Sequence, residues 1–463
     1  MTAPTVSTAS GSGIADAHTD AFKAGLRGRL LRHGDDAYDD ARRLWNGMFD
    51  RRPALIARCA GAADVVKAVH FARDHRLPLA VRGGGHSFPG HSVCDGGLVV
   101  DLSSMKGIRV DPVARTVRAE AGMKWIDFDA ETQAFGLATT GGTASDTGIA
   151  GLTLGGGLGW LSSKHGLTVD NLISADVMLA DGRFITTSAT NHADLFWGLR
   201  GGSGNFGVVT SFEYQLHVVG PTILGGMLAY PLGKAKEVLR FYREFNRTAP
   251  DELTTYAVFV TPPGGETVVA LACCYAGPVH KGEDVVRPLK IFGTPAQAQL
   301  GPMSYVAMQR MFDDGLPAGS FYYTKGEFLA DLTDTAIDVF AEYATTKPSP
   351  LSAVMVQTVR GAAARVPSDA TAFAHRRFAY APVIVSQWLE PADAEKNVAW
   401  ARAFGTALRT FAGGAVYVND LSHDDGDRVR SAYGVNYERL AALKKTYDPE
   451  NLFRLNPNIK PAP

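Results

Sequence analysis

Apolar and polar positions alternate in a regular order near the start of the chain. Residues 54–60 (ALIARCA) form a short apolar run, which predicts a strand. Residues 61–77 place apolar side chains three to four positions apart, with an acidic start and a basic end, as a surface helix does. Further apolar runs at 78–82 and 97–105 predict two more strands. This order predicts a β-α-β unit.

The following hundred residues continue to mix strands and helices. Residues 109–122 alternate like two strands joined by a turn, and residues 124–138 have helical spacing. Residues 173–188 (ISADVMLADGRFITTS) predict a hairpin, because an Asp-Gly pair separates two strand-like runs. Residues 194–216 predict a short helix, a glycine loop and a strand.

Beyond residue 220 the pattern changes. Amphipathic helices are predicted at 235–249 and 333–346. They alternate with strand-like runs at 223–232, 254–263 and 266–277. The combination predicts a separate antiparallel sheet with helices on one face. At the C-terminus, the stretch 427–459 predicts one helix, an Asp-Pro turn and an extended tail.

Composition and charge are those of an ordinary soluble protein. Of 463 residues, 46% are hydrophobic and 20% are charged, and the net charge is −1. There is no basic stripe for nucleic acid or an anionic membrane surface, and no apolar run of transmembrane length. Residues 1–20 lack the basic and apolar regions of a signal peptide, so we expect a flexible tail and a cytoplasmic protein. The four cysteines lack metal-ligand or CxxC spacing and are expected to be buried thiols; no metal is expected.

The 50 glycines are clustered, and one cluster carries a histidine. The stretch RGGGHS follows a predicted strand, and successive backbone N–H groups in such a loop can bind phosphate oxygens. It matches neither a Walker A loop nor a GxGxxG fingerprint. A tight turn with a surface histidine is the alternative. Three separate glycine loops, at 82–87, 148–159 and 201–207, favour one long ligand that lies along several backbone segments.

These motifs together resemble the berberine bridge enzyme-like family of FAD-linked oxidases, within the vanillyl-alcohol-oxidase superfamily. The pattern is closest to bacterial members with a single histidyl link. The resemblance covers nearly everything after residue 40, and the matching stretches are Arg82–Ser87, Gly148–Leu161, Asp170–Asn171, Arg200–Val209 and Tyr447–Ile459.

The resemblance implies a two-domain α+β fold of the vanillyl-alcohol-oxidase type. An FAD-binding domain is expected over residues 40–220, and a substrate domain with a helix-covered antiparallel sheet over 221–415. Residues 416–463 are expected to return to the FAD domain, and residues 1–39 to form a flexible tail and lead-in. The substrate is expected to bind between the two domains.

The resemblance also implies how the flavin is attached. The histidine of the RGGGHS motif, His86, is expected to bond covalently to the flavin 8-methyl group; His91 competes with it but lies outside the motif. Ala144 occupies the position at which many members carry a second linking cysteine, so a single histidyl link is expected. Thr147 falls where the family controls oxygen access to the flavin, and a small side chain there suits an oxidase.

The remaining FAD contacts are assigned by resemblance to residues of the matching stretches. They are Arg82, Gly83, Gly84, Gly85, Ser87, Gly142, Thr143, Ala144, Gly148, Gly151, Gly155, Gly156, Asp170, Asn171, Asn205, Gly207, Val208, Val209, Asn456 and Asn458.

The catalytic base is expected near the stretch YVND, which resembles a YxNY motif of the family. Tyr417 and Asn419 keep the pattern, and Asp420 replaces the second tyrosine. If the stretch is a strand, Tyr417 and Asn419 share one face. Tyr417 is then either a phenolate of lowered pKa that acts as the base, or a packed aromatic whose hydroxyl is satisfied. Both alternatives stay open.

The substrate wall is expected in the second domain. Tyr323 and Lys325 lie in a stretch that resembles a pocket-lining segment of the family. Met355 and Gln357 would share one face of a strand, although a solvated position is the favoured alternative for Gln357. Trp388 is expected to pack in the core rather than contact substrate.

The implied reaction is hydride transfer from a small-molecule alcohol or amine to the flavin, followed by electron transfer to O2 with formation of H2O2. The partners are thus a small-molecule substrate and O2. Alternatives are an oxygenating flavoenzyme of polyketide tailoring, a flavin-binding protein of low turnover, and a protein that binds the pyrophosphate of another cofactor. The fold does not name the substrate, and the oligomeric state stays open.

Overall fold

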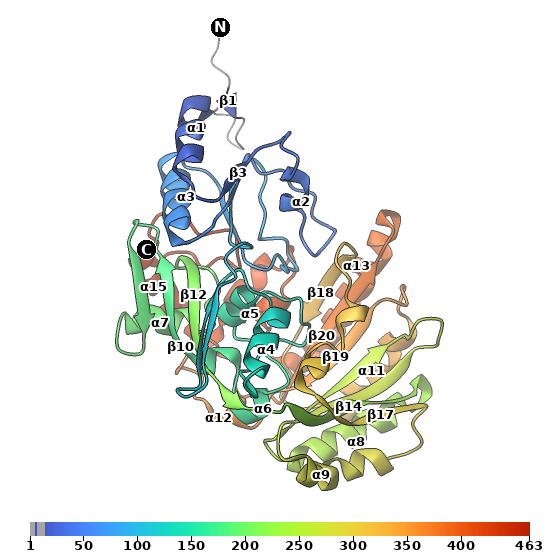
Figure 1. The fold of residues 1–463 in the computed structure, drawn as a ribbon. Helices are drawn as coiled ribbons and strands as arrows, with labels where there is room; N and C mark the ends of the chain where they lie inside the picture. The colour runs from blue at the N-terminus through green and yellow to red at the C-terminus, as the bar shows by residue number, and fades with distance from the viewer. Residues whose placement is uncertain (1–4, 7–13) are drawn as a thin grey trace.

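The computed structural model describes residues 5–6 and 14–463 and contains both helices and sheets, so the fold is α+β as predicted (Figure 1). Its first sheet confirms the β-α-β unit: β4 and β5 both pair in parallel with β6. The elements are β3 (Arg29–Leu31), β4 (Leu55–Arg58), α3 (Ala62–Asp74), β5 (Leu79–Arg82) and β6 (Leu98–Asp101). Because strand β5 ends at Arg82, the glycine loop begins at its carboxyl end.

The second sheet has five antiparallel strands in the order β11-β10-β12-β8-β7 and contains both predicted hairpins. The strands are β7 (Ile108–Asp111), β8 (Thr116–Glu120), β10 (Leu172–Met178), β11 (Phe184–Ser188) and β12 (Val208–Gln215). The helices in this part of the chain are α4 (Trp125–Gln133), α5 (Ile149–Gly155), α6 (Ser162–His165) and α7 (Ala193–Leu199). One continuous apolar core joins this sheet to the first.

The second domain, in which the sequence predicts the substrate wall and which is called the substrate domain below, contains a seven-stranded antiparallel sheet; an antiparallel sheet was predicted. Its strands are β14 (Thr222–Pro231), β15 (Leu253–Val260), β16 (Val268–Tyr275), β17 (Gln297–Ser304), β18 (Phe321–Gly326), β19 (Ala353–Thr358) and β20 (Tyr380–Trp388). Across the sheet they follow the order β17-β14-β16-β15-β19-β20-β18. Four helices share a core with one face: α8 (Ala235–Thr248), α9 (Val279–Ile291), α11 (Asp334–Thr345) and α13 (Ala394–Ala412).

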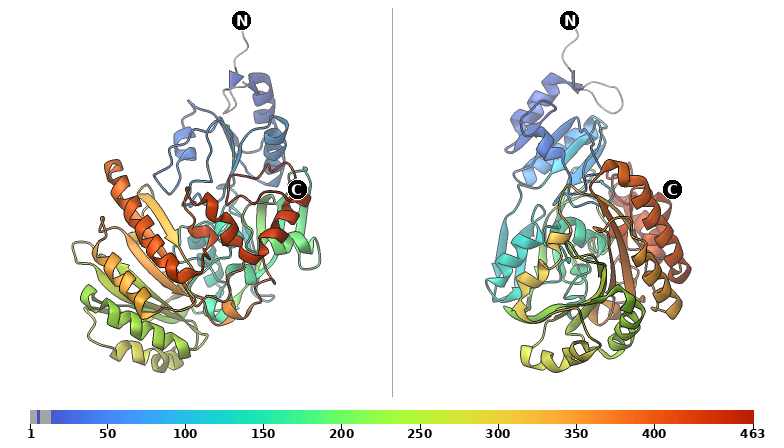
Figure 2. Two further views of the ribbon diagram at one scale, coloured as in Figure 1. Left: turned by 180° about the vertical axis from the view of Figure 1, so that it is seen from behind. Right: turned by 90° about the vertical axis from the view of Figure 1, so that its right-hand side faces the viewer.

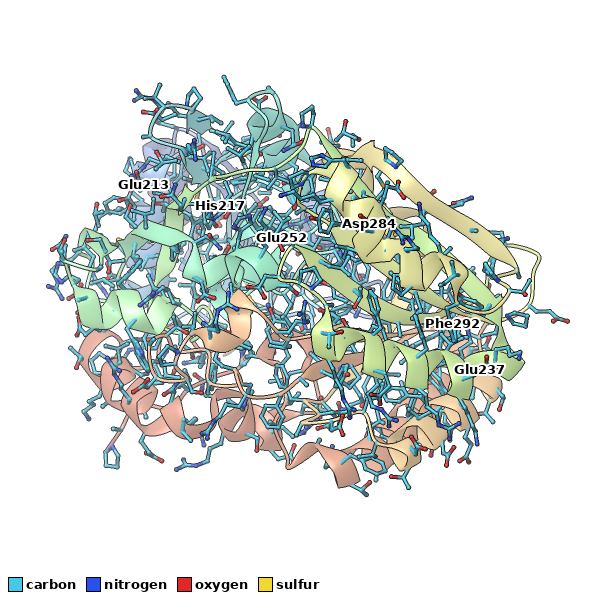
Figure 3. The ribbon with its side chains drawn as sticks, turned by 90° about the horizontal axis from the view of Figure 1, so that it is seen from below. Glu213, His217, Glu237, Glu252, Asp284 and Phe292 are labelled. Atoms are coloured by element: carbon cyan, nitrogen blue, oxygen red, sulfur yellow. The ribbon has the colours of Figure 1, made fainter. Side chains whose placement is uncertain are left out.

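The other face of this sheet turns toward the FAD domain. A smaller core joins Tyr256 of β15 to Trp160 and to α10 (Tyr305–Gln309). Figure 2 shows α13 lying across the helix-covered face, and Figure 3 shows Glu237 of α8 and Asp284 of α9 in the outer layer, on the far side from Glu213 and His217. The sheet thus separates a helical layer from the interface between the domains.

The C-terminal segment lies against the FAD domain, with α15 beside α7 (Figure 1). The single helix predicted here is two, α14 (Val429–Tyr433) and α15 (Tyr437–Tyr447), because the chain turns at Gly434 with a φ of +52°. A completely buried ion pair between Lys444 and Asp448 (2.7 Å) lies at the C-terminal end of α15, and Lys444 also donates to the backbone oxygen of Asn205. Trp388 is buried in the core of the substrate domain, as expected.

The tail predicted at the N-terminus is shorter than expected. Helix α1 (Asp16–Gly25) packs on α3, where Phe22 stacks on Phe71 at 4.3 Å between ring centroids. β3 also lies within the stretch assigned to the lead-in, and α2 (Tyr38–Arg42) begins at its end. Residues 1–4 and 7–13, on which the rest of the predicted tail falls, lie outside the described residues.

All four cysteines are buried, as expected. None of the helices within the described residues is long and apolar enough to cross a membrane.

A buried carboxyl group predicts how stability depends on pH. Asp129 of α4 accepts a hydrogen bond from Gln309 (2.8 Å), and burial raises its pKa from 3.8 to about 7. The folded state therefore holds this proton more tightly than the unfolded state, so this contribution to stability is fully present below pH 4 and is lost as the pH rises to 7. Since a tenfold change in proton affinity is worth about 1.4 kcal/mol, up to about 4 kcal/mol is involved.

We expect Asp129→Asn to remove this part of the pH dependence. The variant should gain stability relative to the wild type at pH 8 and gain none at pH 4, which thermal unfolding followed by circular dichroism would measure. Equal gains at both pH values would contradict the assignment.

Candidate active site

Two glycine loops meet backbone to backbone beside the end of β5. A Cβ atom built on Gly84 would lie 2.5 Å from the Cα of Gly148, and one built on Gly148 would lie 2.6 Å from the nitrogen of Gly84. Neither φ is in the left-handed region, so what requires glycine here is space. The RGGGHS loop and the start of α5 therefore form one surface.

His86 extends from this surface into an aromatic stack. Its ring lies parallel to that of Trp45, with centroids 3.9 Å apart, and Trp45 in turn stacks on Tyr322 of β18 at 3.8 Å. The His86 side chain is 10% exposed, and its Nε2 atom makes no hydrogen bond within residues 14–463. Asp146 Oδ1 lies 3.2 Å from Nε2, outside hydrogen-bonding alignment. The histidine is thus fixed by stacking and faces one carboxylate.

His91 occupies a different environment. Its backbone N–H donates to Ser87 Oγ at 3.1 Å, so Ser87 closes the turn that follows the RGGGHS loop. Burial, together with the charges of Arg51 and His423, lowers the pKa of His91 to about 4. Its partners are therefore not those of His86, and His86 remains the candidate for cofactor attachment.

Asn46 ties this aromatic stack to both domains. It is completely buried, and its amide donates to the backbone oxygens of Phe88 (2.8 Å) and Tyr322 (2.9 Å). Its oxygen accepts from the backbone N–H groups of Tyr322 (3.0 Å) and Met48 (3.1 Å). Trp45 itself donates its backbone N–H to Gly85. The neighbours of Trp45 are thus held by hydrogen bonds on both sides.

We expect Asn46→Ala to destabilise the protein and to loosen His86. Each buried polar group left without a partner costs about 1–3 kcal/mol, so the free energy of unfolding should fall by roughly 3–5 kcal/mol. Asn246→Ala is the control, because Asn246 is a buried amide of α8 that bonds Thr255 and Tyr242, remote from the stack. Denaturant unfolding and flavin content would separate the two: only Asn46→Ala should lower flavin content. Full flavin content in Asn46→Ala would contradict this role.

Most other residues of the glycine loops contact the surrounding protein and so fix the positions of the loops. The guanidinium of Arg82 donates to the backbone oxygen of Ala41 and lies against Gly85, while its Nε has no partner among the described residues. Ala144 is buried, and Thr147 accepts a backbone hydrogen bond from Trp125 at the start of α4. In contrast, a Cβ on Gly151 would meet nothing within 4 Å, so this side of α5 is open.

Two positions in the same region are closed instead by protein contacts. A Cβ on Gly155 would lie 2.1 Å from the side-chain oxygen of Asn419, and one on Gly156 would lie 2.6 Å from the Phe373 ring. A Cβ on Gly142 would lie 3.3 Å from Leu152, and Thr143 is half-buried. These positions shape the loop through packing.

Asp170 and Asn171, assigned to the cofactor by resemblance, use their polar groups within the protein. Asp170 accepts two hydrogen bonds from Arg376, both 2.7 Å, and one from the backbone of Leu167. Asn171 donates to the backbone oxygens of His165 and Leu167 and bonds His217. The side chains of both residues are therefore held by the protein, and their contact with a cofactor stays a prediction.

The third glycine loop, residues 201–207, and the C-terminal asparagines are likewise held by the protein. Asn205 donates to the backbone oxygen of Pro457 and accepts from the N–H of Ile459, which fixes the C-terminal segment. Gly207, Val208 and Val209 enter the sheet at the start of β12. The side-chain oxygens of Asn456 and Asn458 are buried and have no partner among the described residues, so these two remain candidates for direct contact.

The prediction that Tyr323 and Lys325 face the substrate is wrong by one position along β18. Both point to the helical side of the sheet: Lys325 pairs with Asp425 at 2.6 Å, and Tyr323 donates to Asp424 at 2.8 Å. The alternate residues face the FAD domain, because Tyr322 stacks on Trp45. Thr324 shares the face of Tyr322.

Met355 and Gln357 occupy one face of β19, as predicted. Gln357 pairs in register with Tyr256, whose ring lies 4.4 Å from that of Trp160 in the FAD domain. The Gln357 side-chain oxygen is buried and has no partner in the part of the chain that the structure describes. This amide is therefore not the solvated group of the alternative; it is a free acceptor at the domain interface.

The YVND stretch forms a short 3₁₀ helix, Val418–Asp420, rather than a strand. Tyr417 and Asn419 nevertheless meet, because the Asn419 amide donates to the Tyr417 hydroxyl at 2.9 Å. The hydroxyl also accepts from the backbone N–H of Gly157 (2.9 Å), and burial raises its pKa. The geometry matches the packed alternative, since a phenolate base needs a lowered pKa.

Asp420 is the unforeseen titratable group. It is buried against Gly326, at the end of the β18 face that carries Tyr322 and Thr324. Its backbone oxygen accepts from Thr324, but no hydrogen bond reaches its carboxylate from the described residues. Burial raises its pKa from 3.8 to about 7, so the group changes charge near neutral pH. A buried carboxyl of this kind is suited to hold or release a proton.

The arrangement fits a flavin dinucleotide. The backbone contact of Gly84 with Gly148 shapes the loop surface, and the side of α5 at Gly151 is open to a close ligand. His86 and Gln357 present buried polar atoms without partners among the described residues. Sequence reasoning found these five positions. It missed Trp45, Asn46, Asp146, Tyr322 and Asp420; only the departure of Asp420 from the YxNY motif was a signal.

Two family models match the chain. A model described as "FAD binding domain" matches residues 53–188, and one described as "Berberine and berberine like" matches residues 416–460. The first contains His86 and the loop of Gly148, and the second contains Tyr417 and Asp420. Each of the two matched segments thus contributes residues to the candidate site.

Whole-chain comparisons agree with these matches. The chain is 34% identical over 452 residues to an FAD-linked oxidoreductase of Dictyostelium discoideum, covering 95% of this chain and 96% of the relative. It is 29% identical over 451 residues to (R)-6-hydroxynicotine oxidase of Paenarthrobacter nicotinovorans, covering 94% and 97%.

Solved structures show the same overall fold. The crystal structure of 6-hydroxy-D-nicotine oxidase from Arthrobacter nicotinovorans superposes with a TM-score of 0.87 at 28% identity, covering 94% of this chain and 98% of that one. A chitooligosaccharide oxidase superposes with a TM-score of 0.84 at 25% identity, covering 96% and 99%. These likenesses confirm the predicted two-domain FAD-binding fold.

Proposed function

Since the chain belongs to the berberine bridge enzyme-like family of FAD-linked oxidoreductases, we propose that it is an oxidase of small-molecule alcohols or amines with covalently bound FAD. The flavin, when bound, would take a hydride from the substrate carbon and pass the electrons to O2, giving H2O2. The observation that carries the proposal is the His86 ring, held by Trp45 beside the contact of Gly84 with Gly148.

The proposed attachment uses His86 alone. The position of the family's second link is Ala144, and the four cysteines are buried elsewhere in the domain cores. Thr147, in the same loop, leaves room for oxygen to approach in this proposal.

The proposed substrate site lies on the face of the substrate sheet that turns toward the FAD domain. Tyr256, Met355 and Trp160 supply aromatic and apolar surface there, and the free oxygen of Gln357 supplies one acceptor. Such a wall suits a compact, partly apolar molecule whose O–H or N–H group donates to Gln357. One relative acts on 6-hydroxynicotine and a structural neighbour on chitooligosaccharides, so amines and alcohols are both represented.

Asp420 is proposed as the base that takes the O–H or N–H proton of the substrate. It is buried on the same side of β18 as Tyr322, and its pKa of about 7 allows it to be deprotonated at working pH. Tyr417, whose hydroxyl is already bonded to Gly157 and Asn419, would position the loop around it.

The test is anaerobic mixing of the yellow protein with a panel of alcohols, amines and phenolic compounds. Loss of flavin absorbance with one class, then release of one H2O2 per O2 consumed on admission of air, would support the oxidase. Oxygen incorporated into the product instead of H2O2 would favour the oxygenating alternative. No bleaching by any compound would favour a flavin-binding protein of low turnover.

A further inference from the structure

The loop that carries Ala144 also places a carboxylate against His86. Asp146 Oδ1 lies 3.2 Å from His86 Nε2, and the two side chains are 35% and 10% exposed. Burial acts to raise the pKa of Asp146, but His86 and the charge of Lys124 lower it below the usual value. The carboxylate is therefore negative at neutral pH while it touches the imidazole.

The loop around Asp146 is anchored on both sides. Ser145 donates its hydroxyl to Asp313 at 2.6 Å and its backbone N–H at 2.8 Å. On the other side, the backbone oxygen of Thr147 accepts from Trp125 at the start of α4. Asp146 thus has a fixed position, and the stacking of His86 on Trp45 fixes the plane of the imidazole opposite it.

This geometry makes the two imidazole nitrogens unequal. Nε2 lies 3.2 Å from the Asp146 carboxylate, which makes an ion-pair contact although the two groups are not aligned for a hydrogen bond in this structure. The carboxylate is thus next to one particular nitrogen of the ring. A neutral imidazole carries its proton on one nitrogen, and a carboxylate at one nitrogen favours the proton there. Nδ1 then keeps a free electron pair, as a nucleophile requires.

We propose that Asp146 is a positioning residue for cofactor attachment: it holds the His86 proton at Nε2, directs Nδ1 to the flavin 8-methyl carbon, and takes up the Nε2 proton when the bond forms. The inference rests on the proposed covalent link through His86. In the overall step, one C–H bond of the methyl group and the N–H bond of the imidazole break and a C–N bond forms. The two electrons and two protons pass to O2, giving H2O2.

The experiment follows attachment itself. Full-length protein produced in riboflavin-starved cells would be mixed with FAD in air and quenched in acid at intervals. Flavin in the acid pellet and the gain of one FAD by intact mass would report the bond, and fluorescence would report non-covalent FAD binding. The variants are Asp146→Asn, Asp146→Glu and His86→Ala. Asp127→Asn is the matched control, because it removes a nearby carboxylate that pairs with Lys106 instead.

We expect Asp146→Asn to slow attachment about 100-fold, the contribution typical of a placed proton acceptor, with FAD binding within about twofold of wild type. Asp146→Glu should restore part of the rate, Asp127→Asn should match the wild type, and nuclear magnetic resonance of the flavin peptide should show an Nδ1 bond. Equal rates for Asp146→Asn and wild type, an Nε2 bond, or failure of Asp146→Asn alone to bind FAD would overturn the proposal. If the wild type binds FAD but never attaches it, the covalent link of the proposed function fails instead, and this inference with it.

Discussion

Asp420→Asn should slow flavin reduction by substrate about 100-fold or more, which is the usual range for loss of a general base. The Asp420 carboxylate is buried against Gly326. Among the described residues, no charged side chain stabilises the ionised form of this carboxylate by a hydrogen bond. An amide has the same shape but takes no proton. The change should therefore remove proton transfer while it leaves the packing beside β18 intact.

The pH profile separates this role from a structural one. Since burial raises the pKa of Asp420 to about 7, kcat/KM of the wild type should fall as the pH drops below 7 and the base becomes protonated. This inflection should vanish in Asp420→Asn. The matched control is Asp129→Asn, because burial raises the pKa of Asp129 to about 7 as well, yet Asp129 bonds Gln309 away from the site.

Rapid-mixing measurements of flavin reduction between pH 5 and 9 would test both variants. Asp129→Asn should reduce its flavin at the wild-type rate. An unchanged rate and an unchanged inflection in Asp420→Asn would exclude Asp420 as the base and return the question to Tyr417.

The second large effect is expected at the contact between the two glycine loops. Gly148→Ala would place a Cβ 2.6 Å from the nitrogen and 2.7 Å from the Cα of Gly84, and neither backbone can yield by changing a rotamer. Overpacking of this kind costs about 1–3 kcal/mol. If the loops separate to relieve it, FAD affinity should fall by about ten- to a hundred-fold.

Flavin content per polypeptide and FAD titration of the unloaded protein would measure this loss. Gly233→Ala is the control, because Gly233 lies in the substrate domain and a Cβ there would meet nothing within 4 Å. Gly84→Ala should reproduce the loss, since the contact is mutual. Normal FAD content in both loop variants would mean that the two loops do not jointly bind the cofactor.

Local patterns predicted most elements of the fold. The alternation around Asp181 and Gly182 predicted the hairpin of β10 and β11, and helical spacing predicted α3 and α8. The C-terminal helix was predicted as one, because the turn at Gly434 interrupts a pattern that remains amphipathic on both sides. Breaks of this kind depend on tertiary packing, which periodicity does not record.

The site was predicted only in part, for a related reason. Nearly every residue of β18 is buried, so its sequence does not indicate which alternate set faces the FAD domain, and Tyr323 was chosen over Tyr322. Trp45 and Asn46 act through contacts with residues more than 270 positions away. The RGGGHS motif was predictable because a local backbone requirement and a reactive side chain lie together in the sequence.

Attachment of the flavin to His86 can be tested in one measurement. Wild type and His86→Ala would be precipitated with acid, and flavin absorbance would be measured in the pellet and the supernatant. A covalent link through His86 predicts yellow in the wild-type pellet and, for His86→Ala, yellow only in the supernatant. Yellow in the supernatant of both proteins, or in the pellet of both, would contradict it.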